Sequence, residues 1–162
     1  MAVRGFMHLS DLLNERAISL SMAARDKESA IKELVQLLEA AHGVNTKGEI
    51  LSKVLQRESM MSTGIGNGVA IPHGKARAVS RMVAAAAVSP EGVDFQSVDG
   101  EPAMLFVLLA APETVGSLQV KVLANISRVL KEEGVRQSLR DAASSEEFLS
   151  ALIAAEAVHI PQ

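Results

Sequence analysis

The sequence predicts an α/β fold: a single domain in which a mixed β-sheet is flanked by helices on both faces. With 162 residues the chain suits one ordinary domain, and its 48% apolar residues are enough to form a core. Strand-like segments are separated by segments with helical periodicity, and the last third is helical throughout. No repeat, low-complexity tract or linker interrupts residues 1–162, so we expect one domain over that range.

The first strand is expected at Ala17–Met22, where apolar and polar residues alternate. A helix should follow, because Asp26 is a candidate N-cap and Gly43 a candidate stop. Its apolar side is formed by Ile31, Leu34, Val35, Leu37 and Leu38.

Thr46-x-x-Glu49 has the spacing of a capping box and should begin a second helix that runs to about Met61. A glycine-rich segment follows, in which Val69–Ile71 is apolar enough for a short strand.

Two more strands are expected at Val83–Val88 and Ala103–Ala110, the latter apolar throughout and therefore central in the sheet. A helix over Ser117–Lys131, a short one around Val135–Ala142 and a last one capped by Ser144-x-x-Glu147 complete the chain. The inward residues of the first of these helices are predicted to be Val120, Leu123, Ala124 and Leu130.

Composition argues against several classes of function. The four Phe residues, without Trp or Tyr, offer few surfaces on which bases could stack, and the net charge of -3 includes no basic block, so we expect no nucleic-acid partner. The absence of cysteine excludes disulfides and thiolate sites. The N-terminal residues lack an apolar signal region, and the run Ala103–Pro112 is too short to span a bilayer, so we expect a cytoplasmic protein without membrane insertion.

Among the four histidines, His73 has the most unusual context, Ile71-Pro72-His73-Gly74-Lys75. Pro72 restricts its own backbone and that of the preceding residue, so the chain that carries the imidazole is stiff. Gly74 has no Cβ, which would let an anion or a partner approach the ring. A neutral imidazole is a usable nucleophile, so His73 is the candidate for covalent chemistry. The other three fit surface or structural roles: His8, His42 and His159.

Groups that would bind an anion stand nearby: Arg57, Ser62, Thr63, Asn67 and Lys75. Arg57 is the best of them, because its planar guanidinium can grip two phosphate oxygens. Alternatively, the two cations are solvated surface charges and the two hydroxyl residues belong to a turn.

Other active-site motifs fail on spacing. Gly64-x-Gly66-x-Gly68 lacks the dinucleotide-binding spacing and follows a helix, and no P-loop, H-E-x-x-H or Gly-x-Ser-x-Gly motif occurs. The histidines are too dispersed to suggest a metal site. We therefore expect neither a metal nor an organic cofactor.

One long motif resembles the signature of the fructose/mannitol class of enzyme IIA domains of the phosphoenolpyruvate-dependent phosphotransferase system. It consists of Arg57-Glu58 and Ser62-Thr63-Gly64-Ile65-Gly66-Asn67-Gly68-Val69-Ala70-Ile71-Pro72-His73-Gly74-Lys75. The likeness covers nearly the whole chain and includes His8 to Leu13, Gly92 to Phe95, Asp99 to Pro102, Leu139 to Ala142 and Glu146 to Leu149.

The resemblance implies a relay of phosphoryl groups. His73 would form a tele-phosphohistidine by accepting the group from the histidine-containing phosphocarrier protein, which enzyme I charges. Arg57, Ser62, Thr63, Asn67 and Gln119 would stabilise the phosphate. The family fold, a mixed sheet between helices, agrees with the fold class predicted above.

Gln119 departs from the family pattern, which has a second histidine at this position. Its amide can donate a hydrogen bond to phosphate or to the ring of His73, but it cannot become a cation or move a proton. Alternatively, it is a residue on the helix surface.

The residues of the motif are most similar to those of the nitrogen-regulatory branch of this class. This similarity predicts a switch whose target proteins sense the phosphate on His73. The alternatives are a transport component that passes phosphate to a IIB domain for fructose or mannitol uptake, and a binding module that is not phosphorylated.

Overall fold

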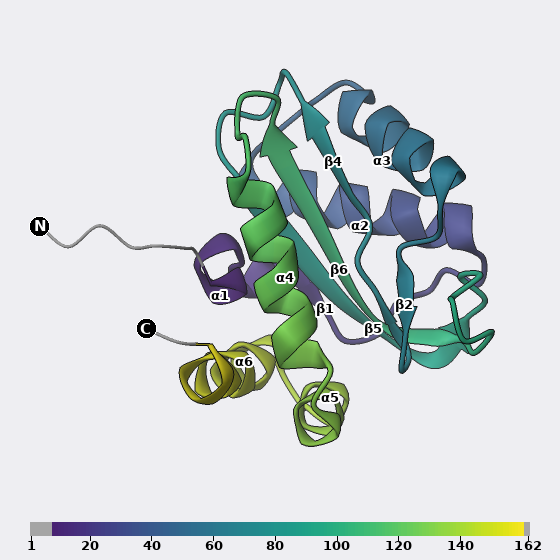
Figure 1. The fold of residues 1–162 in the computed structure, drawn as a ribbon, viewed down its shortest axis with the longest axis vertical. Helices are drawn as coiled ribbons and strands as arrows, with labels where there is room; N and C mark the ends of the chain where they lie inside the picture. The colour runs from purple at the N-terminus through teal and green to yellow at the C-terminus, as the bar shows by residue number, and fades with distance from the viewer. Residues whose placement is uncertain (1–7, 161–162) are drawn as a thin grey trace, which may run out of the picture.

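A computed structural model of the chain describes residues 8–160. In that range the helices are α1 (Leu9–Leu12), the 3-10 helix η1 (Glu15–Ala17), α2 (Lys27–His42), α3 (Glu49–Met60), α4 (Leu118–Leu130), α5 (Glu133–Arg140) and α6 (Ser145–His159). The strands are β1 (Ile18–Ser19), β2 (Gly64–Gly66), β3 (Val69–Ala70), β4 (His73–Ala76), β5 (Val83–Val93) and β6 (Ala103–Pro112). The last third is helical, as predicted (Figure 1).

The strands of residues 8–160 form one mixed, six-stranded sheet in the order β1-β5-β6-β3-β2, with β4 also paired to β6. β6 is the central strand: it runs antiparallel to β5 and parallel to β3 and β4. The apolar run from residue 103 predicted this central position, which is confirmed.

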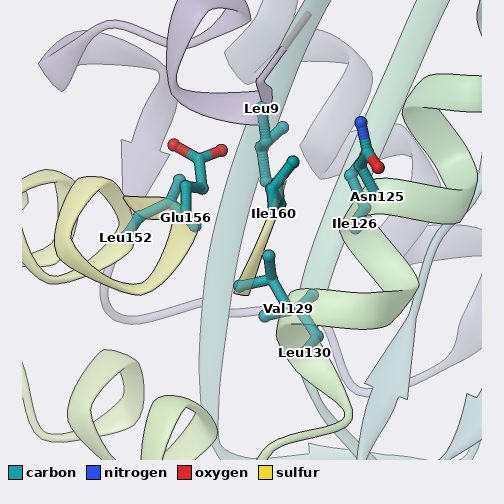
Figure 2. Close-up of a pocket in the computed structure, with 8 residues that line it drawn as sticks. All are labelled: Leu9, Asn125, Ile126, Val129, Leu130, Leu152, Glu156 and Ile160. Atoms are coloured by element: carbon teal, nitrogen blue, oxygen red, sulfur yellow. The ribbon is translucent and has the colours of Figure 1, made fainter. Parts of the chain in front are cut away.

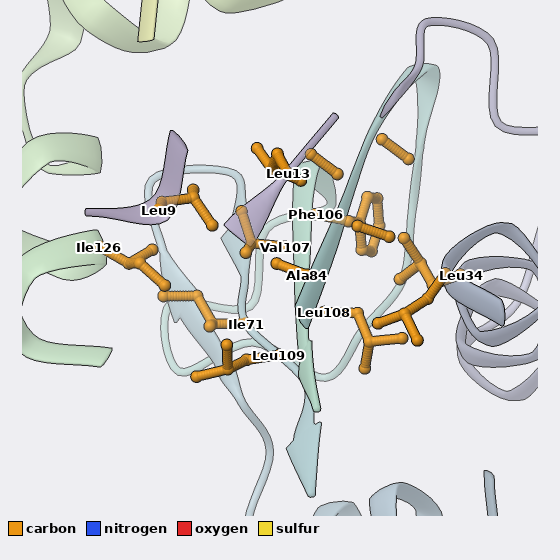
Figure 3. Packing of buried hydrophobic residues seen from close by; sticks show 14 of the residues in the cluster. Leu9, Leu13, Leu34, Ile71, Ala84, Phe106, Val107, Leu108, Leu109 and Ile126 are labelled. Atoms are coloured by element: carbon orange, nitrogen blue, oxygen red, sulfur yellow. The ribbon is translucent and has the colours of Figure 1, made fainter. Parts of the chain in front are cut away.

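Helices cover both faces of this sheet, which confirms the predicted fold class. In Figure 1, α4 lies in front of the sheet and α2 behind it. Successive residues of β6 point to opposite faces, as the pleat of a strand requires. Figure 3 shows Val107 and Leu109 on the side of Ile126 from α4, and Phe106 and Leu108 on the side of Leu34 from α2. These side chains are buried and belong to one core.

Three predicted helix boundaries are confirmed. Asp26 caps α2, its side chain accepting a hydrogen bond from the backbone N of Ser29 at 2.9 Å. Gly43 ends that helix in the left-handed conformation, with φ 64°. Ser144 caps α6 by accepting from the backbone N of Glu147 at 3.0 Å.

The predicted capping box at Thr46 is wrong. The helix begins later, at Glu49, and its N-cap is Gly48 with φ 87°. The carboxylate of Glu49 does not turn back to cap the helix, because it accepts hydrogen bonds from the backbone of residues 77 and 78. Thr46 instead accepts from the backbone N of Ile50.

The predicted inward face of α4 is wrong in part. Val120 is 66% exposed, and the helix buries a stripe that includes Val122, Ile126 and Val129. Apolar residues fill two overlapping stripes of this helix, so periodicity alone does not decide which one packs. Leu130 is buried, as predicted.

The strands differ from expectation in two places. At one edge of the sheet, the first strand is shorter than predicted and consists of Ile18–Ser19 alone. The glycine-rich segment contains β2 and β4 in addition to the expected strand, which is Val69–Ala70. β4 has the sequence HGKA, without apolar alternation, and forms because it pairs with β6 from His73 to Ala76.

Candidate functional site

An open pocket of about 550 Å³ lies between α3, the start of β4 and the turn that leads into α4. In Figure 1, β4 lies between α3 and β6, and α4 crosses in front of the sheet. Seven residues line the pocket: Lys53, Arg57, His73, Gly74, Lys75, Glu113 and Gln119. The structure therefore brings together five residues that the sequence analysis named, which are Arg57, His73, Gly74, Lys75 and Gln119.

His73 is held by the sheet and by a hydrogen bond of its own ring. It is the first residue of β4 and pairs with Leu109 of β6, whose backbone N donates to the carbonyl of Pro72 at 3.1 Å. The ring Nδ1 lies 2.9 Å from the carbonyl oxygen of Ile71. A carbonyl only accepts, so Nδ1 carries the hydrogen. In the neutral ring the lone pair is then on Nε2.

The environment keeps this ring neutral. Burial lowers the pKa of His73 below its ordinary value of 6.5, and the cation of Arg57 lowers it further. The hydrogen bond to Ile71 and the carboxylate of Glu58 act in the opposite direction but do not reverse the shift. At neutral pH the imidazole is therefore uncharged, which is the form that can attack phosphorus.

Gly74 allows α3 to approach β4. A Cβ on Gly74 would lie 3.0 Å from a methyl group of Val54 and 3.2 Å from its backbone N. The space beside Gly74 thus holds a helix backbone, which explains the missing Cβ by the packing of α3. Gly74 also lines the pocket, and the approach of an anion or a partner past this glycine stays a prediction. The close approach of α3 places Lys53 and Arg57, one helical turn apart, beside His73.

Arg57 and Gln119 supply donors from two different helices. Nη1 of Arg57 donates to the carbonyl of Met61 at 2.9 Å, which leaves its other guanidinium nitrogens available. Gln119 lies in the first turn of α4 and is only 6% exposed, so it is not a residue of the helix surface. Its Nε2 is buried and has no hydrogen-bond partner in the described part of the chain.

Ser62, Thr63 and Asn67 lie outside the pocket. Ser62 donates to the carbonyl of Phe95 at 2.8 Å. Thr63 binds the buried carboxylate of Glu58 through its hydroxyl and its backbone N. The backbone N of Asn67 donates to a carboxylate oxygen of Asp99. The structure gives these three residues roles in the turns around β2, and it does not bring them to His73.

Sequence reasoning missed Lys53 and Glu113. The spacing of four residues between Lys53 and Arg57 was a signal, because it places both on one face of a helix. Glu113 follows β6 and is distant in sequence from the glycine-rich motif, so no local pattern connected it with His73.

A second cavity, shown in Figure 2, lies between α1, α4 and α6. It is lined mainly by apolar side chains and has no room for a water molecule. The buried carboxylate of Glu156 accepts hydrogen bonds from the backbone N and hydroxyl of Ser10 and so joins the two ends of the described chain. We interpret this cavity as imperfect core packing.

Residues 8–160 contain neither a metal-binding cluster nor a membrane-spanning helix. No three His, Asp or Glu side chains come together in a way that would hold a metal ion. None of the helices described is both long enough and apolar enough to cross a membrane.

Comparison with known proteins identifies the family. Residues 11–155 match the model of the "Phosphoenolpyruvate-dependent sugar phosphotransferase system, EIIA 2". A fructose-specific EIIABC component of Bacillus subtilis (strain 168) is 36% identical over 143 residues, which are 88% of this chain and 22% of that longer protein. A nitrogen regulatory protein of Bradyrhizobium diazoefficiens is 34% identical over 146 residues, 90% of this chain and 95% of that one.

Solved structures show the same fold. The nitrogen regulatory protein IIA-Ntr of Neisseria meningitidis superposes with a TM-score of 0.79 at 28% identity, covering 89% of this chain and 98% of that one. Enzyme IIAMTL of Escherichia coli, in a complex with phosphorylated enzyme IIBMTL, gives a TM-score of 0.75 at 26% identity over 88% and 97% of the two chains. The chain therefore belongs to the EIIA 2 family of the phosphoenolpyruvate-dependent sugar phosphotransferase system.

Proposed function

We propose that this chain is a phosphocarrier in which Nε2 of His73 accepts a phosphoryl group from the histidine-containing phosphocarrier protein, and that the phosphate acts as a regulatory switch of the nitrogen type. The observation that carries the proposal is the hydrogen bond from Nδ1 to Ile71, which directs the lone pair to Nε2 in a pocket lined by three cations. The tele nitrogen is therefore the expected site of phosphorylation.

The transfer needs no cofactor. The lone pair of Nε2 forms a bond to phosphorus as the bond between phosphorus and the donor's histidine nitrogen breaks, and the electron pair of that bond stays on the donor. Arg57, with Lys53 and Lys75, would stabilise the charge on the phosphoryl oxygens during the transfer. The unpaired Nε2 of Gln119 would donate one further hydrogen bond.

The regulatory role draws support from a relative with that name and from the charge of the pocket. The nitrogen regulatory protein of Bradyrhizobium diazoefficiens matches this chain over 95% of its length. A phosphoryl group adds nearly two negative charges at neutral pH to a pocket whose charged lining residues are three cations and one carboxylate. Target proteins that contact this surface would distinguish the two states of His73.

A transport role is the second candidate. The fructose-specific relative and the structural likeness to an enzyme IIA seen with its IIB partner both favour it. The phosphate on His73 would then pass to a IIB domain. In a third possibility the chain binds partners without being phosphorylated. Its support is Gln119, which stands where the family pattern has a second histidine.

The first test is intact-mass analysis after incubation with phosphoenolpyruvate, enzyme I and the phosphocarrier protein. We expect an acid-labile gain of one phosphoryl group in the wild type and in His159→Gln, a control on the last residue of α6. The variant His73→Ala should gain none. Absence of label in the wild type, while a known IIA domain is labelled in the same tube, would contradict the carrier proposal and favour the binding module.

The second test separates regulation from transport. The phosphorylated chain is mixed with a fructose-type and a mannitol-type IIB domain, and loss of the label from His73 is followed with time. Retention of the label with both IIB domains is expected for a regulatory switch. Rapid transfer to either of them would instead support the transport role.

A further inference from the structure

Glu113 contributes the only carboxylate that lines the His73 pocket in the described structure. It lies directly after β6, in the turn that leads to α4. One of its oxygens is 3.8 Å from Nζ of Lys53, and the other is 3.8 Å from Nε of Arg77. An acidic group at a site for a dianionic phosphate requires an explanation.

The ion pairs of Glu113 do little for folding. The side chains of Glu113 and Lys53 are 41% and 44% exposed, and that of Arg77 is 86% exposed. Exposed pairs at this distance add little to stability, because water and salt screen them. The position of the carboxylate is therefore better explained by its effect on the pocket than by a structural role.

Lys53 connects Glu113 with the phosphate. Its ammonium group lines the same pocket as His73, so a phosphoryl group on Nε2 and the carboxylate of Glu113 would compete for it. The carboxylate would also repel the phosphate directly. Both effects raise the free energy of the phosphorylated state relative to the unphosphorylated one.

Resting on the proposed function, we propose that Glu113 is a positioning residue that weakens the retention of phosphate on His73 and so favours its onward transfer. A pocket with only cationic side chains would stabilise phosphohistidine and slow its release. The carboxylate opposes this by engaging Lys53 and by repelling the phosphoryl oxygens. Glu113 thus sets the equilibrium of the transfer and takes no part in breaking or forming the phosphorus bond.

The test measures how a phosphoryl group divides between two proteins at equilibrium. Purified phosphorylated carrier protein, free of phosphoenolpyruvate and enzyme I, is mixed with an equal amount of wild type, Glu113→Gln, Glu113→Asp or the exposed control Glu101→Gln. We expect Glu113→Gln to shift the equilibrium constant toward the phosphorylated chain by about two- to fivefold, the range for a partly screened charge pair. Glu113→Asp should stay near the wild type, and Glu101→Gln should equal it.

Two further readouts separate charge from structure. Phosphorus NMR should show a lower pKa for the second ionisation of the phosphoryl group in Glu113→Gln, since a repelling charge is removed. The free energy of unfolding should be unchanged. In a Lys53→Gln background, the effect of Glu113→Gln on the equilibrium should be smaller, because the competition for Lys53 is gone.

The possible outcomes are distinct. If the wild type accepts no phosphate, the proposed function fails and this inference fails with it. If the wild type is labelled but Glu113→Gln has the same equilibrium constant, or favours the donor, then the inference alone is overturned.

Discussion

At the scale of single residues, the pKa of His73 is the property that pH can test. Burial and Arg57 hold this pKa below 6.5, so most of the rings should be neutral at pH 7 and the midpoint of protonation should lie below pH 6.5. Replacing Arg57 removes a repelling cation, and Arg57→Gln should therefore raise the pKa of His73. Nitrogen NMR of the imidazole measures both values, with the exposed Arg128→Gln as control. A wild-type pKa of 6.5 or above would contradict this account.

Replacing Gln119 should have opposite effects on the stability of the fold and on the rate of phosphoryl transfer to His73. Its buried Nε2 has no partner in the described structure, and an unsatisfied buried donor costs roughly 1–3 kcal/mol. The variant Gln119→Met has a similar volume without the amide, so it should raise the free energy of unfolding by about 1 kcal/mol. If the amide serves the phosphate, the same change should slow phosphorylation at least about tenfold.

Urea unfolding and a single-turnover rate measure the two effects of Gln119→Met. Gln56→Met, on an exposed position of α3, is the matched control and should change neither. A variant that is more stable and equally fast would show that Gln119 does not contact the phosphate.

The sequence located the centre of the site but only part of its surroundings. The context of His73 and the guanidinium of Arg57 were visible in one short stretch of the sequence, and the resemblance added Gln119. Lys53 and Glu113 were missed because they reach the pocket through helix packing and through the turn after β6. Phosphate binding by Ser62, Thr63 and Asn67 stays a prediction that their positions do not support.

At the scale of elements, the contact between α3 and β4 depends on Gly74. A Cβ there would lie 3.0 Å from Val54, so Gly74→Ala should push the helix away and reduce the free energy of unfolding by about 1–3 kcal/mol. The same shift would move Lys53 and Arg57 from His73 and slow phosphorylation. Urea unfolding and the phosphorylation rate check the two effects.

Gly134→Ala is the matched control for Gly74→Ala. No atom lies within 4 Å of a Cβ at this position in α5, and alanine is the better helix former, so stability should stay equal or increase by up to about 1 kcal/mol. Equal stability of Gly74→Ala and the wild type would show that α3 yields to the added methyl group.

The sequence predicts whether a segment forms a helix or a strand better than it predicts where the element begins and which face is buried. The cap of α2 and the central place of β6 follow from local chemistry and from a long apolar run, and both are confirmed. The predictions of the inward face of α4 and of the start of α3 were wrong. Partners distant in sequence decide which apolar stripe of a helix packs and which carboxylate caps its first turn. β4 exists through its pairing with β6, a partner that its own four residues do not reveal.

At the scale of the whole molecule, one buried core connects α1, both faces of the sheet and α6, as the residues of Figure 3 illustrate in part. The core includes Leu9 at one end of the described chain and Ile160 at the other. With so much shared burial, no part of the structure should unfold alone, and we predict a single cooperative transition.

The absence of Trp and Tyr makes this last prediction simple to test. Val158→Trp, on α6, and Val98→Trp, in the segment between β5 and β6, place single fluorophores at positions that are 76% and 73% exposed, so neither should disturb the core. Both reporters should give the same urea midpoint and slope as the far-ultraviolet circular dichroism of the same variant. An earlier transition at Val158→Trp would instead show that α6 separates first. The sheet that carries His73 would then be stable without α6, and the carrier site would depend on α3, α4 and the strands but not on the last helix.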